Sequence, residues 1–171
     1  MLMDNKKTVS KILEASNYLS LPNMSEFVKA YIEKLVYNIS MYVDADFSLG
    51  SVEILTNFTG KSELSQAITG VPSAYSCIDG KEDALVTFAE HYSHLGIKSF
   101  DVLAREAILD FLNLHNGLFV VMLSKNNICE LSLDAPKQNG NFSIDLAQYK
   151  SITVIPVMFE YGTVKFFLCE L

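Results

Sequence analysis

The segment that most constrains the fold is a long stretch of helical periodicity that begins at Phe100. Its apolar residues fall on one broad face when the residues are plotted at 100° each: Ala104, Ala107, Ile108, Phe111, Leu114 and Leu118. Ser99 precedes the segment as the expected N-cap. A helix with so wide an apolar face must pack against another layer of structure. Propensity alone does not fix where this helix ends, because Phe119-Val120-Val121 favours a strand.

Two shorter helices are predicted before this segment. The first covers Lys6 to Tyr18, and Leu21-Pro22-Asn23 ends it. The second runs from about Met24 to Val43, where apolar residues again repeat at helical spacing and Ser25 favours a start. We therefore expect residues 1–23 to form a helical extension in front of the main domain.

Most of the other periodic segments predict strands. We expect one hairpin from Ala74–Ile78 and Ala84–His91 around Asp79-Gly80-Lys81, and a second from Ile152–Phe159 and Val164–Leu168. The second hairpin is rich in β-branched and aromatic residues, which favour strands.

Three further segments complete the prediction. Phe47–Asn57 alternates well enough for a strand, with Gly50 as a turn or bulge inside it, and Ile128–Leu133 also alternates. Ser62–Thr69 fits either a helix or a loop. This order of helices and strands predicts one α+β domain over residues 1–171, with a mostly antiparallel β-sheet and long helices packed on it.

Composition limits the classes of partner. The chain has 171 residues, of which 50% are hydrophobic and 19% charged, and its net charge is −7. So apolar a chain is not disordered, and an acidic one lacks the basic surface that nucleic acid and anionic membranes require. Its longest apolar runs, such as Leu118–Leu123, are too short to span a bilayer. The polar start, Met1 to Lys7, does not resemble a secretory signal, so we expect a cytoplasmic protein.

Cysteine and histidine give no strong indication of a site. Cys77, Cys129 and Cys169 are odd in number and lack CxxC spacing, which favours reduced, buried residues. His91 and His94 have no further ligand at matching spacing, so we predict strand-end histidines and no metal site.

A polar stripe runs along the long helix on the side opposite its apolar face. Glu106, Asp110, Asn113 and Gly117 occupy positions i, i+4, i+7 and i+11, which share one side of a helix. Such a stripe is most often only a solvated face. It can also serve a function, because a carboxylate can bind a cation of a partner and a neutral amide can orient a water molecule without repelling a phosphoryl group.

The stripe resembles the signature helix of the CheC/CheX/FliY chemotaxis phosphatases. That signature has an Asp or Ser, then Glu after three residues, Asn after two more, and a proline about 22 residues later. Here 22 residues separate Asn113 from Pro136. The segment from Val154 to Phe159, with Gly162, also resembles the closing hairpin of CheX-like domains. The earlier helix has Glu33 but Val36 in place of Asn, so the single copy resembles CheX more than two-site CheC proteins.

The resemblance implies a CheC/CheX-like fold in which the helix continues past Gly117 to about Ser124. It also implies a phosphatase that acts on a phosphorylated response regulator of the CheY type. In that family the phospho-aspartate, Mg²⁺ and an active-site lysine belong to the regulator, so the resemblance implies no cofactor of this protein's own. Asn113 would then orient the attacking water as a catalytic residue. Asp110 would pair with the lysine, and Glu106, Asp110 and Gly117 would contact the partner. A homodimer is a further expectation.

The sequence departs from the signature in ways that leave alternatives open. Asp110 stands where the family has Glu and is one methylene shorter, and Glu106 replaces Asp or Ser. Leu118 and Phe119 follow Gly117, where the family has small residues. These departures motivate a second hypothesis, a catalytically weak or inactive regulator-binding module on the same fold. A third is an interaction domain whose stripe matches only by chance.

Overall fold

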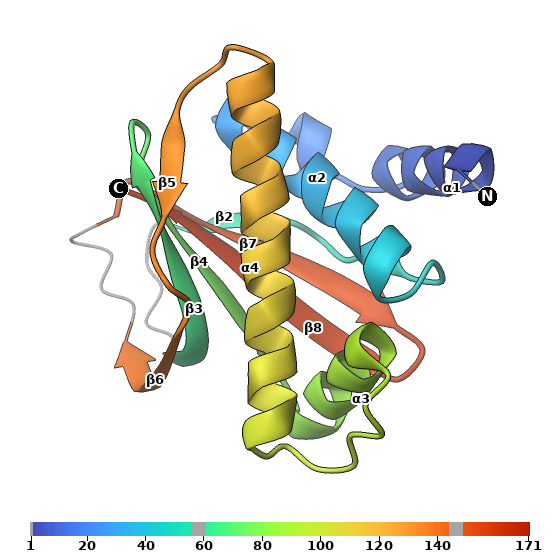
Figure 1. Cartoon of the computed structure of the whole chain (residues 1–171). Helices are drawn as coiled ribbons and strands as arrows, with labels where there is room; N and C mark the ends of the chain where they lie inside the picture. The colour runs from blue at the N-terminus through green and yellow to red at the C-terminus, as the bar shows by residue number, and fades with distance from the viewer. Residues whose placement is uncertain (1, 56–60, 144–148) are drawn as a thin grey trace.

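The computed structural model describes residues 2–55, 61–143 and 149–171. These residues form eight strands and four α-helices (Figure 1). The helices, with one short 3₁₀ turn, are α1 (Leu2–Glu14), η1 (Tyr18–Ser20), α2 (Glu26–Tyr42), α3 (Glu82–Ser93) and α4 (Val102–Lys125). The strands are β1 (Ser48–Leu49), β2 (Glu53–Leu55), β3 (Lys61–Gly70), β4 (Ala74–Gly80), β5 (Leu131–Leu133), β6 (Lys137–Ser143), β7 (Ser151–Phe159) and β8 (Gly162–Glu170).

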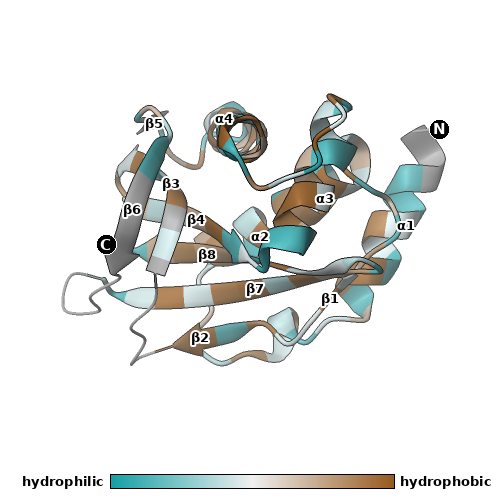
Figure 2. Cartoon of the chain, turned by 90° about the horizontal axis from the view of Figure 1, so that it is seen from below, coloured by the Kyte–Doolittle hydropathy of each residue, from teal (hydrophilic) through white to brown (hydrophobic). Residues whose placement is uncertain are grey.

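The strands form one antiparallel sheet in the order β1-β7-β8-β4-β3-β5, with β2 also paired to β7 and β6 to β3. Helices α2, α3 and α4 cover one face of this sheet (Figure 2). The α+β class and the antiparallel sheet are therefore confirmed. The C-terminal hairpin is confirmed as well, since β7 and β8 pair from Ser151↔Glu170 to Phe159↔Gly162.

The predicted hairpin around Asp79-Gly80-Lys81 is wrong in its second half. Ala84–His91 lies within helix α3 and forms no strand. Its buried residues are Ala84, Leu85, Phe88 and Ala89, which is helical spacing, and acidic residues occupy the first turn. A short apolar segment fits the period of a strand as well as that of a helix, so the sequence did not distinguish the two.

Four other strand assignments differ from expectation. Ser62–Thr69 is neither helix nor loop but lies in strand β3, where Leu64, Gln66 and Ile68 alternate on the buried face. The expected strand Phe47–Asn57 is divided into β1 and β2 around Gly50, and its last two residues lie outside the described part of the chain. Strand β6 was not predicted, and β5 begins three residues later than Ile128.

Helix α4 begins at a different cap but has the expected length. Asp101 is the N-cap, since its Oδ1 accepts from the Ala104 N–H at 3.1 Å. Ser99, the expected cap, donates its hydroxyl to Asp101 Oδ2 at 2.9 Å and so supports the cap from outside the helix. The helix continues without interruption through Phe119-Val120-Val121 to Lys125.

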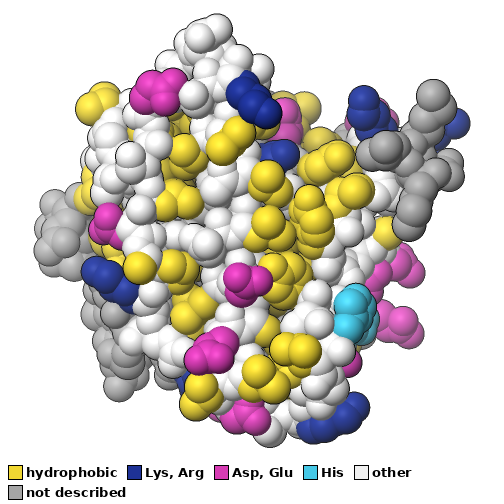
Figure 3. All heavy atoms as spheres, in the orientation of Figure 1, with side chains coloured by type: hydrophobic (Ala, Val, Ile, Leu, Met, Phe, Trp, Pro, Cys, Tyr) yellow, Lys and Arg dark blue, Asp and Glu magenta, His cyan; other side chains and the backbone are white. Residues whose placement is uncertain are grey.

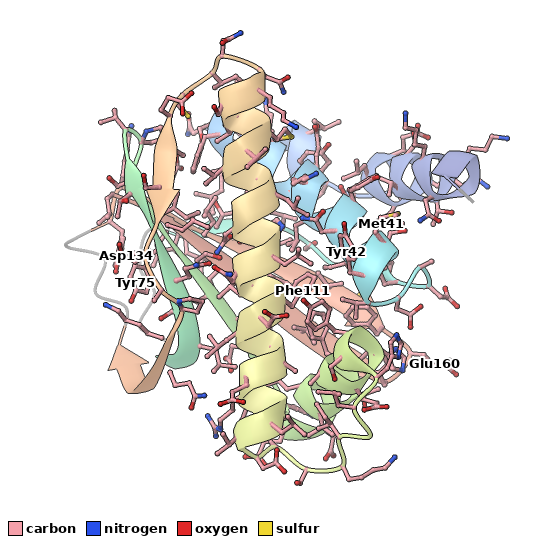
Figure 4. The ribbon with its side chains drawn as sticks, in the orientation of Figure 1. Met41, Tyr42, Tyr75, Phe111, Asp134 and Glu160 are labelled. Carbon is pink, nitrogen blue, oxygen red and sulfur yellow. The ribbon has the colours of Figure 1, made fainter. Side chains whose placement is uncertain are left out.

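The buried face of α4 is wider than the predicted one. Leu112, His115, Asn116 and Phe119 are completely buried, whereas Leu114 and Leu118 are only half-buried. Phe111 points from α4 toward α3 and β8 (Figure 4) and packs edge-on against Phe88, with ring centroids 5.1 Å apart. By length and composition alone, α4 could cross a membrane, but half of that stretch is buried in this protein. Packing in the core therefore accounts for its apolar character.

Candidate functional site

The predicted stripe lies on the outer side of α4. Glu106, Asp110 and Asn113 are exposed, and Gly117 is half-buried. Acidic side chains lie over this part of α4 with apolar side chains beside them (Figure 3). Burial of Asn113 would have excluded contact with a partner. A rigid 24-residue helix instead displays the acid and the amide one turn apart.

Tyr92, near the end of α3, holds the carboxylate of Asp110. Its hydroxyl donates to Asp110 Oδ2 at 2.7 Å. Burial, and then the neighbouring carboxylate, raise the pKa of Tyr92, so the hydroxyl keeps the proton that it donates. A neutral donor fixes the position of a carboxylate without neutralising it. Asp110 therefore has a defined orientation.

An apolar groove of about 500 Å³ lies beside the stripe, between α4 and the last turns of α2 and α3. Its apolar lining comes from Tyr42, Leu95, Leu103, Ala107 and Leu114. Tyr42 extends toward α4 from the last turn of α2 (Figure 4). Leu95 and Leu103 are 60% and 43% exposed, and Glu106 and Asp110 line the same groove. Apolar contact area and negative charge are thus combined on one surface.

Asn113 is held from the other side, by the sheet. Its Oδ1 accepts from Gln66 Nε2 on β3 at 2.7 Å, and the same nitrogen donates to the Asp134 carbonyl at 2.8 Å. Asp134 lies in the connection between β5 and β6 (Figure 4), two residues before Pro136. The fold therefore brings the connection that contains the expected proline to the Gln66 side chain that holds Asn113.

Behind Gln66 the polar contacts continue into the core. Asn116 Nδ2 donates to Gln66 Oε1 at 2.8 Å, and the Tyr31 hydroxyl lies 3.5 Å from Asn116 Oδ1 and 2.6 Å from Ser76 Oγ. Gln66, Asn116, Tyr31 and Ser76 are completely buried. Buried polar groups are tolerated only when they are hydrogen-bonded, so these side chains fix one another's positions.

The earlier helix, α2, presents no second copy of the site. Val36, at the position of the signature Asn, is completely buried. Glu33 accepts a hydrogen bond at 3.1 Å from Tyr18, which lies in the segment before α2. Burial and the Glu33 carboxylate raise the pKa of the Tyr18 hydroxyl to about 12. A residue of the N-terminal segment thus already hydrogen-bonds the Glu33 carboxylate of α2.

Neither histidine nor cysteine forms a site in the described residues. His91 and His94 lie at the end of helix α3 and not at a strand end. His91 Nδ1 is 3.2 Å from Asp44 Oδ2, and His94 is the helix C-cap in a left-handed conformation. Within residues 2–55, 61–143 and 149–171, no group of three metal-binding side chains gathers. Cys77 and Cys169 are buried as expected, whereas Cys129 is only half-buried.

Sequence reasoning missed three residues that support the stripe: Gln66, Tyr92 and Asn116. Gln66 lies between Leu64 and Ile68, at a position of the alternating strand that should be apolar. Recognition of that strand would have marked Gln66 as a buried polar residue. Asn116 lies one helical turn from the apolar Leu112, a weak signal on its own. No local pattern marks Tyr92, because its partner Asp110 lies 18 residues away.

Comparison with known proteins gives matches in structure alone. No protein-family model and no curated protein matches the sequence. The structure is similar to a CheC-like superfamily protein from Shewanella sp. PV-4, with a TM-score of 0.70 at 16% identity over 86% of this chain and 99% of the other. It is similar to the chemotaxis protein CheX from Desulfovibrio desulfuricans, with a TM-score of 0.69 at 14% identity, over 86% and 100% of the two chains.

A third similar structure was solved with a partner. It is CheX from Borrelia burgdorferi in a complex with CheY, BeF₃ and Mg²⁺, with a TM-score of 0.66 at 11% identity over 85% of this chain and 97% of that one. The sheet and its covering helices thus define an α+β protein with a fold found in chemotaxis proteins. More specifically, the fold is CheC/CheX-like, as the signature residues predicted.

Proposed function

We propose that this protein binds a phosphorylated response regulator of the CheY type and accelerates hydrolysis of its phospho-aspartate. One observation carries the proposal: Asp110 and Asn113 are exposed one turn apart on α4, and separate elements hold each side chain in place. The fold supports it, because a protein with this fold has been solved in complex with CheY.

The chemistry follows from the residues. Asp110, with Glu106 one turn before it, attracts the active-site lysine of the regulator, and the apolar groove supplies contact area beside that charge pair. Asn113 then lies next to the phosphoryl group and orients water for in-line attack. Its amide carries no charge, so it does not repel the phosphoryl oxygens. Catalysis of this kind consists mainly of positioning, and two fixed side chains suffice for it.

The regulator brings the remaining components. Mg²⁺ and the phospho-aspartate are expected on the partner, so this chain needs no cofactor of its own. We also place the protein in the cytoplasm, where regulators of this class function. The half-buried Gly117 fits a partner surface approaching α4 closely, because a Cβ there would meet only Leu133 Cδ1, at 3.9 Å. Packing within the described residues thus does not account for this glycine.

Phosphate release from a regulator tests the proposal. CheY-type regulators of the same organism are phosphorylated with acetyl phosphate and mixed with wild type, Asn113→Ala or Asp110→Ala. We expect Asn113→Ala to lower kcat at least about 100-fold and Asp110→Ala mainly to raise KM. Asn126→Ala is the matched control, because Asn126 is an exposed asparagine at the C-terminal end of α4, away from the stripe.

Two results would point elsewhere. Binding to a phosphorylated regulator without faster phosphate release would favour the catalytically inactive binding module. If no regulator binds at all, the stripe is only a solvated helix face and the proposal fails.

A further inference from the structure

Gln66 is a buried amide placed directly against the candidate site. It lies on β3 between Leu64 and Ile68, on the face of the sheet that the helices cover, and is completely buried. A buried amide without hydrogen bonds is costly. Its partners therefore determine which conformation Gln66 adopts.

The partners use nearly all the hydrogen-bonding capacity of Gln66. Nε2 donates both of its hydrogens, to Asn113 Oδ1 at 2.7 Å and to the Asp134 carbonyl at 2.8 Å. Oε1 accepts from Asn116 Nδ2 at 2.8 Å. A glutamine amide offers two donors and one acceptor oxygen, so both donors and the oxygen are engaged.

The Asp134 carbonyl fixes the direction of all these bonds. Amide oxygen and nitrogen are easily interchanged in a structure, so their assignment needs an independent anchor. A backbone carbonyl can only accept, and the Gln66 atom that faces it must therefore be nitrogen. That nitrogen also faces Asn113, so the Asn113 atom turned toward the sheet must be oxygen. The Asn113 Nδ2 then points away from Gln66.

We infer that Gln66 is a positioning residue for the proposed reaction: it holds Asn113 Oδ1 inward and presents the Asn113 Nδ2–H₂ group to the regulator. The inference rests on the proposed function. In this orientation Nδ2 donates to the attacking water or to a phosphoryl oxygen, while the second lone pair of Oδ1 remains for a proton of that water. The orientation is set before the regulator binds, so no rotamer freedom of Asn113 is lost during the reaction.

The same contacts could instead serve only to pack α4 on β3. A purely structural role predicts lower stability with unchanged kinetics in the folded fraction. A positioning role predicts a lower kcat at unchanged KM, since regulator binding depends on Asp110 and the groove and not on Asn113 orientation. This split separates the two roles.

Gln66→Met is the informative variant, because it nearly preserves volume and removes both donors. Ser62→Ala is its matched control: Ser62 lies on the same strand and is buried, and its hydroxyl donates to the Leu64 and Ile78 carbonyls and not to the side chains around Gln66. With a CheY-type regulator phosphorylated by acetyl phosphate, we expect Gln66→Met to lower kcat about tenfold or more with KM within about twofold. Ser62→Ala should leave both parameters within about twofold.

A measurement on the wild-type protein tests the orientation without any activity. On ¹⁵N,¹³C-labelled protein, a scalar coupling across the hydrogen bond should connect Gln66 Nε2 with Asn113 Cγ, and the Asn113 Nδ2 protons should exchange with solvent faster than those of Gln66 Nε2. This readout remains decisive if Gln66→Met does not fold.

The possible failures are distinguishable. If Asn113→Ala abolishes activity while Gln66→Met keeps the wild-type kcat, the inference is overturned and the proposed function stands. If neither variant loses activity, Asn113 is not the catalytic residue and the inference fails with that assignment, whereas absence of any acceleration by the wild type would refute the proposed function itself. Absence of the coupling, with slow exchange at Asn113 Nδ2, would overturn the orientation directly.

Discussion

His115 lies on the buried side of α4, and acid should destabilise the protein through it. The imidazole is completely buried, and its Nδ1 lies 3.0 Å from Asn38 Nδ2. The Tyr31 ring packs edge-on against it, with the two ring centroids 4.7 Å apart. Burial, and then the Lys34 ammonium, lower the pKa of His115 from 6.5 to about 3. The lowered pKa keeps the buried ring neutral near pH 7.

The sign of the effect follows from which state binds the proton. Between pH 6.5 and about 3 the unfolded chain protonates His115 and the folded one does not. Acid in this range therefore favours unfolding, and above pH 7 the contribution is constant. At pH 5, which is about 1.5 units below the ordinary histidine pKa, the free energy of unfolding is lower by about 2 kcal/mol, at about 1.4 kcal/mol per pH unit. Against a typical stability of about 5–15 kcal/mol, this loss is measurable.

Urea unfolding of wild type and His115→Gln at pH 7.5, 6 and 5 provides the assay. Glutamine cannot titrate, and its Oε1 can accept from Asn38 Nδ2. The difference between the two proteins cancels the titration of every other group. We expect wild type to lose about 2 kcal/mol more than the variant between pH 7.5 and pH 5. Parallel pH profiles would refute the reasoning, because they would mean that His115 protonates freely in the folded state.

Three further substitutions test the site and the core. Gly117→Ala should raise the free energy of unfolding by about 0.5–1 kcal/mol, because alanine favours a helix over glycine and its Cβ would meet only Leu133 Cδ1, at 3.9 Å. If the same variant binds the regulator more weakly, the partner needs the space at Gly117. Tyr92→Phe removes the hydrogen bond that holds Asp110 and should raise KM several-fold. The free energy of unfolding should fall by less than about 1 kcal/mol, because water replaces the lost donor. An unchanged KM would contradict the role of this hydrogen bond. Phe88→Ala, at a completely buried ring, should cost about 3–5 kcal/mol in thermal or urea unfolding, and a loss below about 1 kcal/mol would place Phe88 outside the core.

The errors in predicting the fold have a common physical cause. Ala84–His91 was predicted as a strand because a short apolar segment fits either period, and its helical burial is decided by α4, against which α3 packs. Ser62–Thr69 was not recognised as a strand because Gln66 interrupts its apolar phase. That interruption is tolerated only where Asn113, Asn116 and Asp134 satisfy the amide. Residues distant in sequence thus determined both segments.

What the sequence determined by itself is the long helix, the stripe on its outer side and the closing hairpin. Each depends on a period of 3.6 or 2 residues, which local chain geometry converts directly into a buried and an exposed face. Only the tertiary structure decided how Asp110 and Asn113 are held. Gln66 lies 47 residues from Asn113, and Tyr92 lies 18 from Asp110, on elements that meet only after the sheet has formed and the helices have packed on it. A hydrogen bond depends on a few tenths of an ångström, and no periodicity in the sequence specifies distances between separate elements so closely.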